Sequence, residues 1–387
     1  MGKRYILFQG IIDTLDLYTQ EFVKILQEKN AECLVVQANH MDAEMIRLKV
    51  FLLQPVTAVI SLNNIGMHLE MESGENIWEC FNVPFYNILM DHPFRYKRAL
   101  ETAPKTTCLL CMDRNHVSYV KRFFPNINQV EFFPHAGIEA GHPGGKMLSQ
   151  AQRPIDVIYA GSLSRYVAEG LVPDLGAIKE FDAFALVHDA LESLIGNPGQ
   201  TTEQVIEQIL KDMNVECDDV KLGDYISQLR FLDSFAVSFY REQMIRALVE
   251  HGIEVTIFGT GWERCEWADN PNLFLRREIP PAQVLELMNY SKIVLNSMTW
   301  FKCGAHDRIF NGMLAGAAVV SDTSEYLEEQ FLQGVELKMF QLTNPKQLLE
   351  AVKQLLEDPR LAQDMSDCGY SCAKKKHMWK HRLERVL

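Results

Sequence analysis

The chain has 387 residues, of which 47% are hydrophobic and 23% are charged, and its formal net charge is −13 at pH 7. These proportions are typical of globular proteins, and the length suffices for two or three domains that each bury a core. The acidic balance argues against a nucleic-acid or anionic-membrane partner, because both are bound by clustered lysines and arginines. The one basic cluster, Lys374–His377, is interpreted as the solvated end of a helix.

The sequence also indicates a cytoplasmic protein. Met1–Arg4 lead directly into an apolar run without a signal peptide, and no stretch reaches the roughly 18 apolar residues of a membrane span. The nine cysteines form no disulfide framework, which fits a reducing compartment. Cys108 and Cys111 have metal-ligand spacing, but no second pair completes a zinc site, so we expect two buried thiols.

As far as residue 135, short apolar runs alternate with amphipathic stretches. The runs predict strands, and the stretches predict helices because their apolar residues recur at helical spacing. Such alternation is typical of a parallel sheet with helices on both faces, where strands are apolar along their whole length. The expected strands are Tyr5–Gln9, Glu32–Gln37, Val56–Ser61, Pro84–Leu89, Thr106–Cys111 and Val130–Phe133.

A polar run rich in proline and glycine, residues 142–154, predicts a linker. A second alternating region begins with the expected strand Asp156–Tyr159 and is interrupted by residues 166–235, where helical periodicity dominates. We interpret this interruption as a helical insertion. It could serve homo-oligomerisation or acceptor docking, or it could simply pack on the core.

We therefore expect an α/β protein of two Rossmann-like doubly wound domains, residues 1–150 and 151–365. The carboxyl ends of their strands would face each other across a cleft, where ligands bind in this architecture. The tail, residues 360–387, has helical character throughout. Its last part, residues 366–387, could pack back on the first domain.

Small residues follow three of the predicted strands. Gly10 follows the first strand of the chain, Gly161 and Ser162 follow the first strand of the second domain, and Gly259–Trp262 follow the next one. Glycine lets a ligand approach the backbone closely, and N–H groups in such turns can bind phosphate. For Gly10 a simple tight turn is the alternative. The GxGxxG and GxxxxGK[ST] motifs are absent, which argues against a dehydrogenase or an NTPase.

The densest polar segment is His306–Gly316, with Asn296 before it. Arg308 falls in the first turn of a predicted helix, where a cation gains nothing from the helix macrodipole. Its planar guanidinium suits an anionic ligand bound alongside. The alternative is an ion pair with Asp307 or Asp322.

The segment Asp322–Glu325 follows a predicted strand at the same edge of the sheet. Its acidic and hydroxyl side chains could simply cap the helix that follows. Because of its place at the cleft, a carboxylate here could instead accept hydrogen bonds from the hydroxyl groups of a ribose or a sugar. Both interpretations remain open at this point.

The second half of the chain carries, in this order, Arg241, Gly259–Trp262, Asn296, His306–Gly316 and Asp322. In this layout it resembles the CgeB-like, family-1-type glycosyltransferases, and it is similar to the retaining GT-B enzymes whose GT4-like C-terminal domain carries a degenerate EX7E motif. The resemblance covers about residues 155–165 and 238–387. The first half matches only in its strand and helix pattern.

The resemblance implies that a sugar is transferred from a nucleotide-diphosphate sugar to a glycan, protein or small-molecule acceptor. It implies that Arg308 neutralises the diphosphate leaving group. No DxD-like metal-binding pair is placed convincingly in the sequence, so we expect no required metal and no cofactor beside the donor substrate. The donor-binding residues that we expect are Gly10, Gly161, Ser162, Gly259, Thr260, Gly261, Trp262, Asn296, Asp307, Asn311, Asp322 and Glu325.

One position departs from this resemblance. Many relatives have a glutamate, which usually holds ribose hydroxyls, where this chain has Asn311. An amide still donates and accepts hydrogen bonds, but it carries no charge. A catalytically inactive relative that binds a nucleotide sugar or a glycan is therefore an alternative. A two-domain sugar epimerase or a periplasmic-type binding protein is a third.

A transferase that inverts the sugar's configuration also needs a general base. Asp91 and His92 follow the fourth predicted strand, and Asp13 and His135 also follow strands, although helix capping explains each of them equally well. With Arg308 and its neighbour His306, the catalytic candidates are Arg308, Asp91, His92 and His306. The residues do not choose between retention and inversion.

Overall fold

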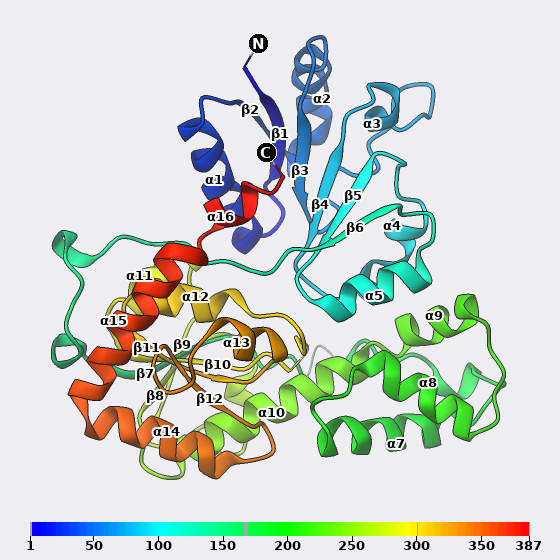
Figure 1. The fold of residues 1–387 in the computed structure, drawn as a ribbon. Helices are drawn as coiled ribbons and strands as arrows, with labels where there is room; N and C mark the ends of the chain where they lie inside the picture. Colours follow the sequence, from blue (N-terminus) through cyan, green and yellow to red (C-terminus); the bar gives the residue numbers. More distant parts are fainter. Residues whose placement is uncertain (1, 166–168, 300, 387) are drawn as a thin grey trace. The chain divides into compact units, whose positions relative to one another are not determined.

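The structure, a computed structural model, describes residues 2–165, 169–299 and 301–386. Its internal contacts divide the chain into two compact units, which are described separately (Figure 1). Unit 1 consists of Met1–His135 and Trp379–Leu387, and unit 2 consists of Ala136–Met378. Each unit contains one six-stranded sheet whose strands are all parallel and are joined through helices, which confirms the expected α/β class.

The sheet of unit 1 has the order β2-β1-β3-β4-β5-β6. Its strands are β1 (Arg4–Gln9), β2 (Glu32–Gln37), β3 (Ala58–Leu62), β4 (Phe85–Leu89), β5 (Thr107–Cys111) and β6 (Gln129–Phe132). Its helices are α1 (Asp13–Glu28), α2 (Met41–Phe51), α3 (Ile77–Cys80), α4 (Lys97–Glu101), α5 (Arg114–Phe123) and α16 (Trp379–Leu383). Strands β3 and β5 are buried along their whole length, as their unbroken apolar runs require.

Unit 1 confirms the expected burial of Cys108 and Cys111, and its last helix packs back on it as we had considered. Cys108 and Cys111 are the expected buried thiols of β5, and burial raises the pKa of Cys108 to about 11. The last helix, α16, packs on α1, where the Trp379 ring lies edge-on to Tyr18 and Phe22 at centroid distances of 5.4 and 5.0 Å. This aromatic contact makes the end of the chain part of the core of unit 1.

The sheet of unit 2 has the order β12-β11-β10-β7-β8-β9. Its strands are β7 (Ile155–Ala160), β8 (Val255–Phe258), β9 (Leu273–Arg276), β10 (Ser291–Asn296), β11 (Ala318–Asp322) and β12 (Lys338–Phe340). Its covering helices are α10 (Phe231–Val249), α11 (Pro281–Met288), α12 (Asp307–Leu314), α13 (Glu325–Gln330), α14 (Pro345–Glu357) and α15 (Pro359–Lys376). The order of connection reverses between β7 and β10, so the switch point at which such sheets bind ligands lies between their carboxyl ends.

The helical insertion consists of α7 (Ala183–Gly196), α8 (Thr202–Asp212) and α9 (Asp219–Gln228). These three helices form a group at one end of α10 (Figure 1). Within this group, α7 packs against α10. We expected the insertion to end at residue 235, but α10 begins at Phe231 and runs unbroken to Val249. It is buried at residues from Phe231 to Val249, and it packs against α7 of the insertion as well as against α14 and β8. The first residues of the expected insertion, 166–168, lie outside the described residues.

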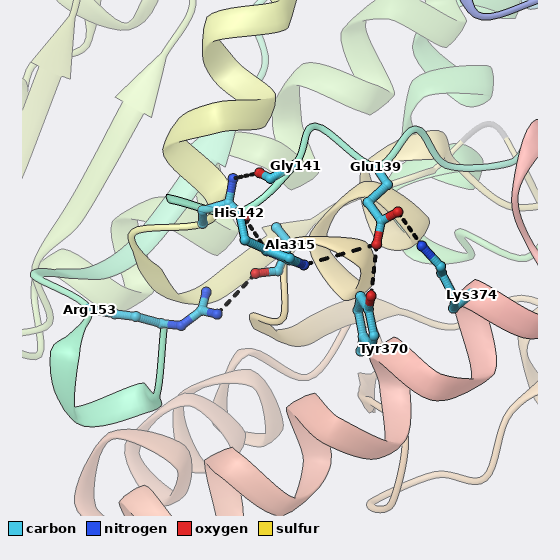
Figure 2. Close-up of polar contacts among 8 residues, drawn as sticks. Glu139, Gly141, His142, Arg153, Ala315, Tyr370 and Lys374 are labelled. Atoms are coloured by element: carbon cyan, nitrogen blue, oxygen red, sulfur yellow. Dashed lines mark hydrogen bonds and ion pairs between the residues drawn. The ribbon is translucent and has the colours of Figure 1, made fainter. Parts of the chain in front are cut away.

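The chain divides earlier than the expected domain boundary at residue 150. Residues of the expected linker are bonded into unit 2: His142 Nδ1 lies 3.0 Å from Asn289 Oδ1, and Arg153 Nη2 donates to the Ala315 carbonyl at 2.9 Å (Figure 2). Glu139 accepts hydrogen bonds from Tyr370 and Lys374 of α15. These bonds place the segment after His135 in unit 2.

The basic cluster near the C-terminus therefore has a structural role through Lys374. Burial acts to raise the pKa of Glu139, but the hydrogen bonds from Lys374 and Tyr370 outweigh it and the pKa is lowered. The tail, which we expected to be helical throughout residues 360–387, consists of the two helices α15 and α16. It breaks at His377 and Met378, because the Gly137 N–H donates to the His377 carbonyl at 2.8 Å and residues 137 and 378 pair as a parallel bridge.

Candidate active site

Arg308 lies at the switch point of the sheet in unit 2. It is the second residue of α12, and its backbone N–H donates to Nδ1 of the N-cap residue His306 at 3.3 Å. The side chain is only 6% exposed. Its Nη1 donates to Asn296 Oδ1 at 2.7 Å, and its Cζ lies 4.9 Å from the centroid of the Tyr159 ring. Helix α12 thus directs the guanidinium to the carboxyl ends of β7 and β10.

The guanidinium has no acidic partner within the described part of the chain. No carboxylate there lies within ion-pair distance of Arg308, so the alternative pairs with Asp307 and Asp322 are not formed. Among the described residues, the side chain that accepts a hydrogen bond from it is the neutral Asn296, whose amide nitrogen donates to Ser321 Oγ at 2.9 Å. A buried cation without a counter-charge is costly, and an anionic ligand would offset that cost.

Gly161 lies directly against this cation. A Cβ atom at position 161 would be 3.2 Å from Arg308 Nη2, so any side chain there would cover the guanidinium. The turn is held by Trp262, which is fully buried and whose Nε1 donates to the Gly161 carbonyl at 2.8 Å. Trp262, which we expected to border the nucleotide, therefore lies in the core, where it fixes the shape of the turn.

The loops after β7 and β8 are bound to each other. Thr260 N–H donates to Ser162 Oγ at 3.1 Å, so this amide has a partner within the protein. A Cβ at Gly259 would lie 2.5 Å from the Gly161 carbonyl oxygen, and one at Gly261 would lie 2.3 Å from the Leu163 carbonyl oxygen. The two glycines are thus required by the close approach of the loops. The Gly161 N–H is also used within the protein, since it donates to the Phe258 carbonyl at 2.9 Å.

A second buried guanidinium, that of Arg241, was absent from the predicted site residues. Arg241 is 8% exposed, and its Nη1 donates to the Ser162 carbonyl at 2.5 Å. Burial lowers the pKa of Arg241, and the charge of Arg308 lowers it further. The sequence did contain a signal, since Arg241 interrupts the apolar positions of α10 at helical spacing: Val237, Tyr240, Met244, Ile245 and Leu248.

The first turn of α12 carries a short polar network. His306 Nδ1 lies 2.9 Å from Asp307 Oδ1, and Asn311 Nδ2 donates to Asp307 Oδ2 at 3.0 Å. Asn311 Oδ1 accepts from the Ile138 N–H at 2.9 Å, and the residue is 4% exposed. The Asn311 amide thus uses both its donor and its acceptor, which a glutamate could not do beside Asp307. Burial lowers the pKa of His306, and the nearby charge of Arg308 adds to this, so the neutral imidazole is favoured.

Asp322 is the last residue of β11, which is separated from β7 by β10, and Glu325 is the first residue of α13. Both residues line a cavity of about 240 Å³ at the ends of β11 and β12. Asp322 is 3% exposed and accepts a hydrogen bond from the Met298 N–H at 2.9 Å. Burial raises the pKa of Asp322 to about 7, against the opposing effects of the Met298 hydrogen bond and the Lys302 charge. Glu325 is exposed and accepts a hydrogen bond from Cys303 Sγ at 3.1 Å.

In unit 1, Asp91 and Gly10 both have partners close by. Asp91 Oδ2 accepts hydrogen bonds from Asn63 Nδ2 at 3.1 Å and from the Tyr96 hydroxyl at 2.7 Å. The Gly10 N–H donates to both carboxylate oxygens of Asp16, at 2.8 and 3.0 Å. The amide that we expected to face a donor phosphate therefore faces a carboxylate of the protein's own first helix.

The remaining candidates of unit 1 have different surroundings. His92 is 6% exposed, accepts a hydrogen bond from the Phe94 N–H at 3.2 Å, and stacks on the Phe94 ring at a centroid distance of 3.9 Å. His135 is buried and its ring lies 6.2 Å from that of Trp379. Asp13 is exposed at the start of α1. The side chains of His92 and His135 therefore lie among aromatic rings in the interior of unit 1, whereas Asp13 lies at its surface.

Comparison with known proteins agrees with this architecture. Residues 241–387 match the family described as "Glycosyl transferase-like". A sucrose-phosphate synthase from Thermosynechococcus elongatus superposes with a TM-score of 0.53 at 11% identity, over 99% of this chain and 97% of that one. The chain has the GT-B glycosyltransferase fold.

A second structure with this GT-B fold is a DNA-modifying beta-glucosyltransferase that was solved with and without its substrate uridine diphosphoglucose. It superposes with a TM-score of 0.52 at 13% identity, over 99% of this chain and 98% of that one. No curated protein matches the chain by sequence. Among the helices of the described residues, none combines the length and the apolar character needed to cross a bilayer.

Proposed function

We propose that this protein transfers a sugar from a nucleotide-diphosphate sugar to an acceptor and that Arg308 binds the diphosphate. The observation that carries the proposal is the buried guanidinium at the switch point of unit 2, which has no carboxylate within ion-pair distance in the described residues. The match of residues 241–387 to a glycosyl transferase-like family supports the same reaction.

The chemistry of such a transfer needs charge stabilisation above all. When the bond between the sugar and the diphosphate breaks, negative charge develops on the leaving phosphate. Arg308 offers a fixed cation at this place, and Arg241 adds a second positive charge close by. Preorganised cations of this kind, in a site with little water, stabilise the transition state more than they would in solution.

The acid–base chemistry follows from the surroundings of each group. The neutral imidazole of His306 can accept a hydrogen bond or a proton beside Arg308, and burial and the Arg308 charge favour that neutral form. Asp91 remains the candidate base in unit 1 for an inverting reaction, oriented by Asn63 and Tyr96. His92 has no part in the proposal, because its ring is stacked in the interior.

Finer assignments are also proposals. We propose a hexosyl donor and a CgeB-like relationship, which the sequence resemblance supports. We also propose a cytoplasmic location, which the nine free cysteines support. We propose a glycan or protein acceptor, no nucleic-acid partner and no required metal, which the acidic composition and the resemblance support. The insertion α7–α9 is the proposed surface for a homo-oligomer. Because uridine diphosphoglucose is the substrate of one structural relative, the beta-glucosyltransferase, we would test this donor first.

The test is a thermal-shift panel of nucleoside diphosphates and nucleotide sugars, followed by a turnover assay with each one that binds. Binding to the native state raises the melting temperature, so we expect a shift with at least one nucleotide and no shift in Arg308→Ala. Arg360→Ala, which removes an exposed arginine of α15, is the matched control and should behave as the wild type. Binding without turnover of any donor would indicate the inactive relative instead, and an unchanged shift in Arg308→Ala would refute the proposed site.

A further inference from the structure

The side chain of Asn296 is fully buried beside the guanidinium of Arg308. Asn296 is the last residue of β10, and the register of the sheet pairs it with Ser321 of β11. Both residues are 0% exposed, so neither side chain is in reach of a ligand. We expected Asn296 to bind the donor directly, but its burial leaves it only an indirect action, through the cation to which it is bonded.

The orientation of the Asn296 amide is fixed by its neighbours. Ser321 Oγ donates its one proton to the Asp322 carbonyl at 2.9 Å, so it accepts from Asn296 Nδ2, which lies 2.9 Å away. The amide oxygen therefore points to the other side, where it accepts from Arg308 Nη1 at 2.7 Å. Because the amide is neutral, it holds this nitrogen in place without cancelling the charge of the guanidinium.

Asn296 uses one nitrogen of Arg308 and leaves the edge formed by the other two nitrogens open. Nε and Nη2 donate to no described residue, and both keep surface that solvent can reach. Gly161 has no side chain to cover Nη2, since a Cβ atom at this position would lie 3.2 Å from it. The Nε–Nη2 edge is therefore the part of the guanidinium that is available to a ligand.

We propose that Asn296 is a positioning residue, which directs Arg308 so that its Nε–Nη2 edge binds two oxygens of one phosphate group of the donor. The N–H bonds of this edge are parallel, and a pair of such bonds is stronger and more specific than contact with a point charge. A carboxylate at position 296 would hold the same nitrogen, but it would cancel the charge that attracts the ligand. This inference rests on the proposed function, because it assigns the way in which the diphosphate is bound.

The test compares the affinity of the whole chain for a diphosphate with the stability of the free protein. UDP, GDP and inorganic pyrophosphate are titrated by calorimetry into wild type and Asn296→Asp, and both proteins are melted without ligand. Asn296→Asp should melt at or above the wild-type temperature, because the new carboxylate gives the buried cation a counter-charge. Its affinity for the diphosphate should fall about 10- to 100-fold, the effect of losing one charge-assisted hydrogen bond.

Asn87→Asp is the matched control. Asn87 is also a 0% exposed residue of a parallel strand, β4, but its amide nitrogen donates to Asn64 Oδ1 at 2.6 Å and its oxygen accepts from the Asn64 N–H. This variant should melt below the wild type, because it loses that donor and buries a charge, and its affinity for the diphosphate should not change. A residue that served only the fold would lose stability and affinity together, so opposite changes in Asn296→Asp identify a positioning role.

Arg308→Lys tests the contact with two oxygens. Lysine keeps the positive charge but offers no parallel pair of N–H bonds, so the affinity for the diphosphate should fall about tenfold. An affinity equal to that of the wild type would show that a point charge is sufficient, and the assigned edge would then be wrong.

The results separate this inference from the proposed function. If Arg308→Met loses the diphosphate but Asn296→Asp binds it as tightly as the wild type, the proposed function stands and the inference fails. The inference also fails if Asn296→Asp melts clearly below the wild type, because the new carboxylate would then not meet a cation without a counter-charge. If none of the three probes binds the wild type, or if Arg308→Met binds them normally, the proposed function fails and the inference fails with it.

Discussion

The strand ends of the two units present polar groups in opposite ways. In unit 1 these groups are used within the unit: Asp16 accepts from the Gly10 N–H, and Asp91 accepts from Asn63 and Tyr96. In unit 2, Arg308 is buried against one neutral acceptor, and Thr299 has no partner among the described residues. These groups of unit 1 thus have partners within the protein, whereas among the described residues Arg308 has no counter-charge and Thr299 Oγ1 has no hydrogen-bond partner.

The largest expected effect concerns Arg308. Arg308→Met should lower turnover of the nucleotide sugar about 100- to 1,000-fold, the usual loss when one charge-stabilising donor is removed. Because the wild-type guanidinium has no counter-charge within the described residues, the melting temperature of the free protein should stay the same or rise. Turnover assays and thermal melts of the same preparation measure both. A clear loss of stability would mean that Arg308 serves the fold, and the contrast between the units would fail.

The next effect tests the amide of Asn311. Asn311→Asp keeps the acceptor for the Ile138 N–H but loses the donor to Asp307 and brings a second carboxylate to within about 3 Å. We expect a loss of about 2–3 kcal/mol of unfolding free energy at pH 8, measured by urea denaturation. Asn344→Asp is the control, because Asn344 caps α14 only as an acceptor. Equal stability of Asn311→Asp and wild type would leave a purely ligand-binding role for Asn311.

A pH effect is expected from Asp322. Its pKa of about 7 in the native state lies above the value of about 4 in the unfolded chain, so the native state binds this proton more tightly. Its contribution to the unfolding free energy should therefore fall as pH rises from about 4 to about 7, by up to about 1.4 kcal/mol per pH unit, and then stay constant. Asp322→Asn keeps the acceptor for Met298, so the difference between wild type and variant should show this slope. A difference independent of pH would contradict the raised pKa.

A smaller effect is expected from the self-satisfied edge of unit 1. Asp16→Ala removes the acceptor of the Gly10 N–H and should cost about 1 kcal/mol of unfolding free energy. Nucleotide affinity, measured by calorimetry, should not change. If the affinity fell together with stability, the Gly10 turn would take part in donor binding, and the two units would differ less than we infer.

No effect is expected from metal removal. Dialysis against EDTA should leave the turnover of the nucleotide sugar unchanged, because in the proposed site the guanidinium groups of Arg308 and Arg241 would neutralise the diphosphate without a metal ion. A loss of turnover that Mg²⁺ or Mn²⁺ restores would require metal ligands that we have not assigned. The same assay also separates the role of Arg308 from that of a bound ion.

The sequence by itself determined the elements and their class. Apolar runs such as Thr106–Cys111 predicted β5 to within one residue, because burial on both faces of a parallel sheet leaves a local signal. The same local reasoning placed Arg308 in the first turn of a helix, as the structure has it. It placed the domain boundary too late and did not predict the break in the tail at His377 and Met378, because the bonds of Glu139 and Gly137 join residues more than 200 positions apart.

Only the tertiary structure decided which polar groups meet. The partners Arg308 and Asn296, Asn311 and Ile138, and Trp262 and Gly161 depend on the order of strands in the sheet and on the register of the loops between them. No local pattern encodes these relations, because a hydrogen bond needs two groups within about 3 Å, and that distance is set only once the chain has folded. For the same reason the absence of a counter-charge around Arg308 among the described residues, on which the proposed function rests, could be seen only in the folded chain.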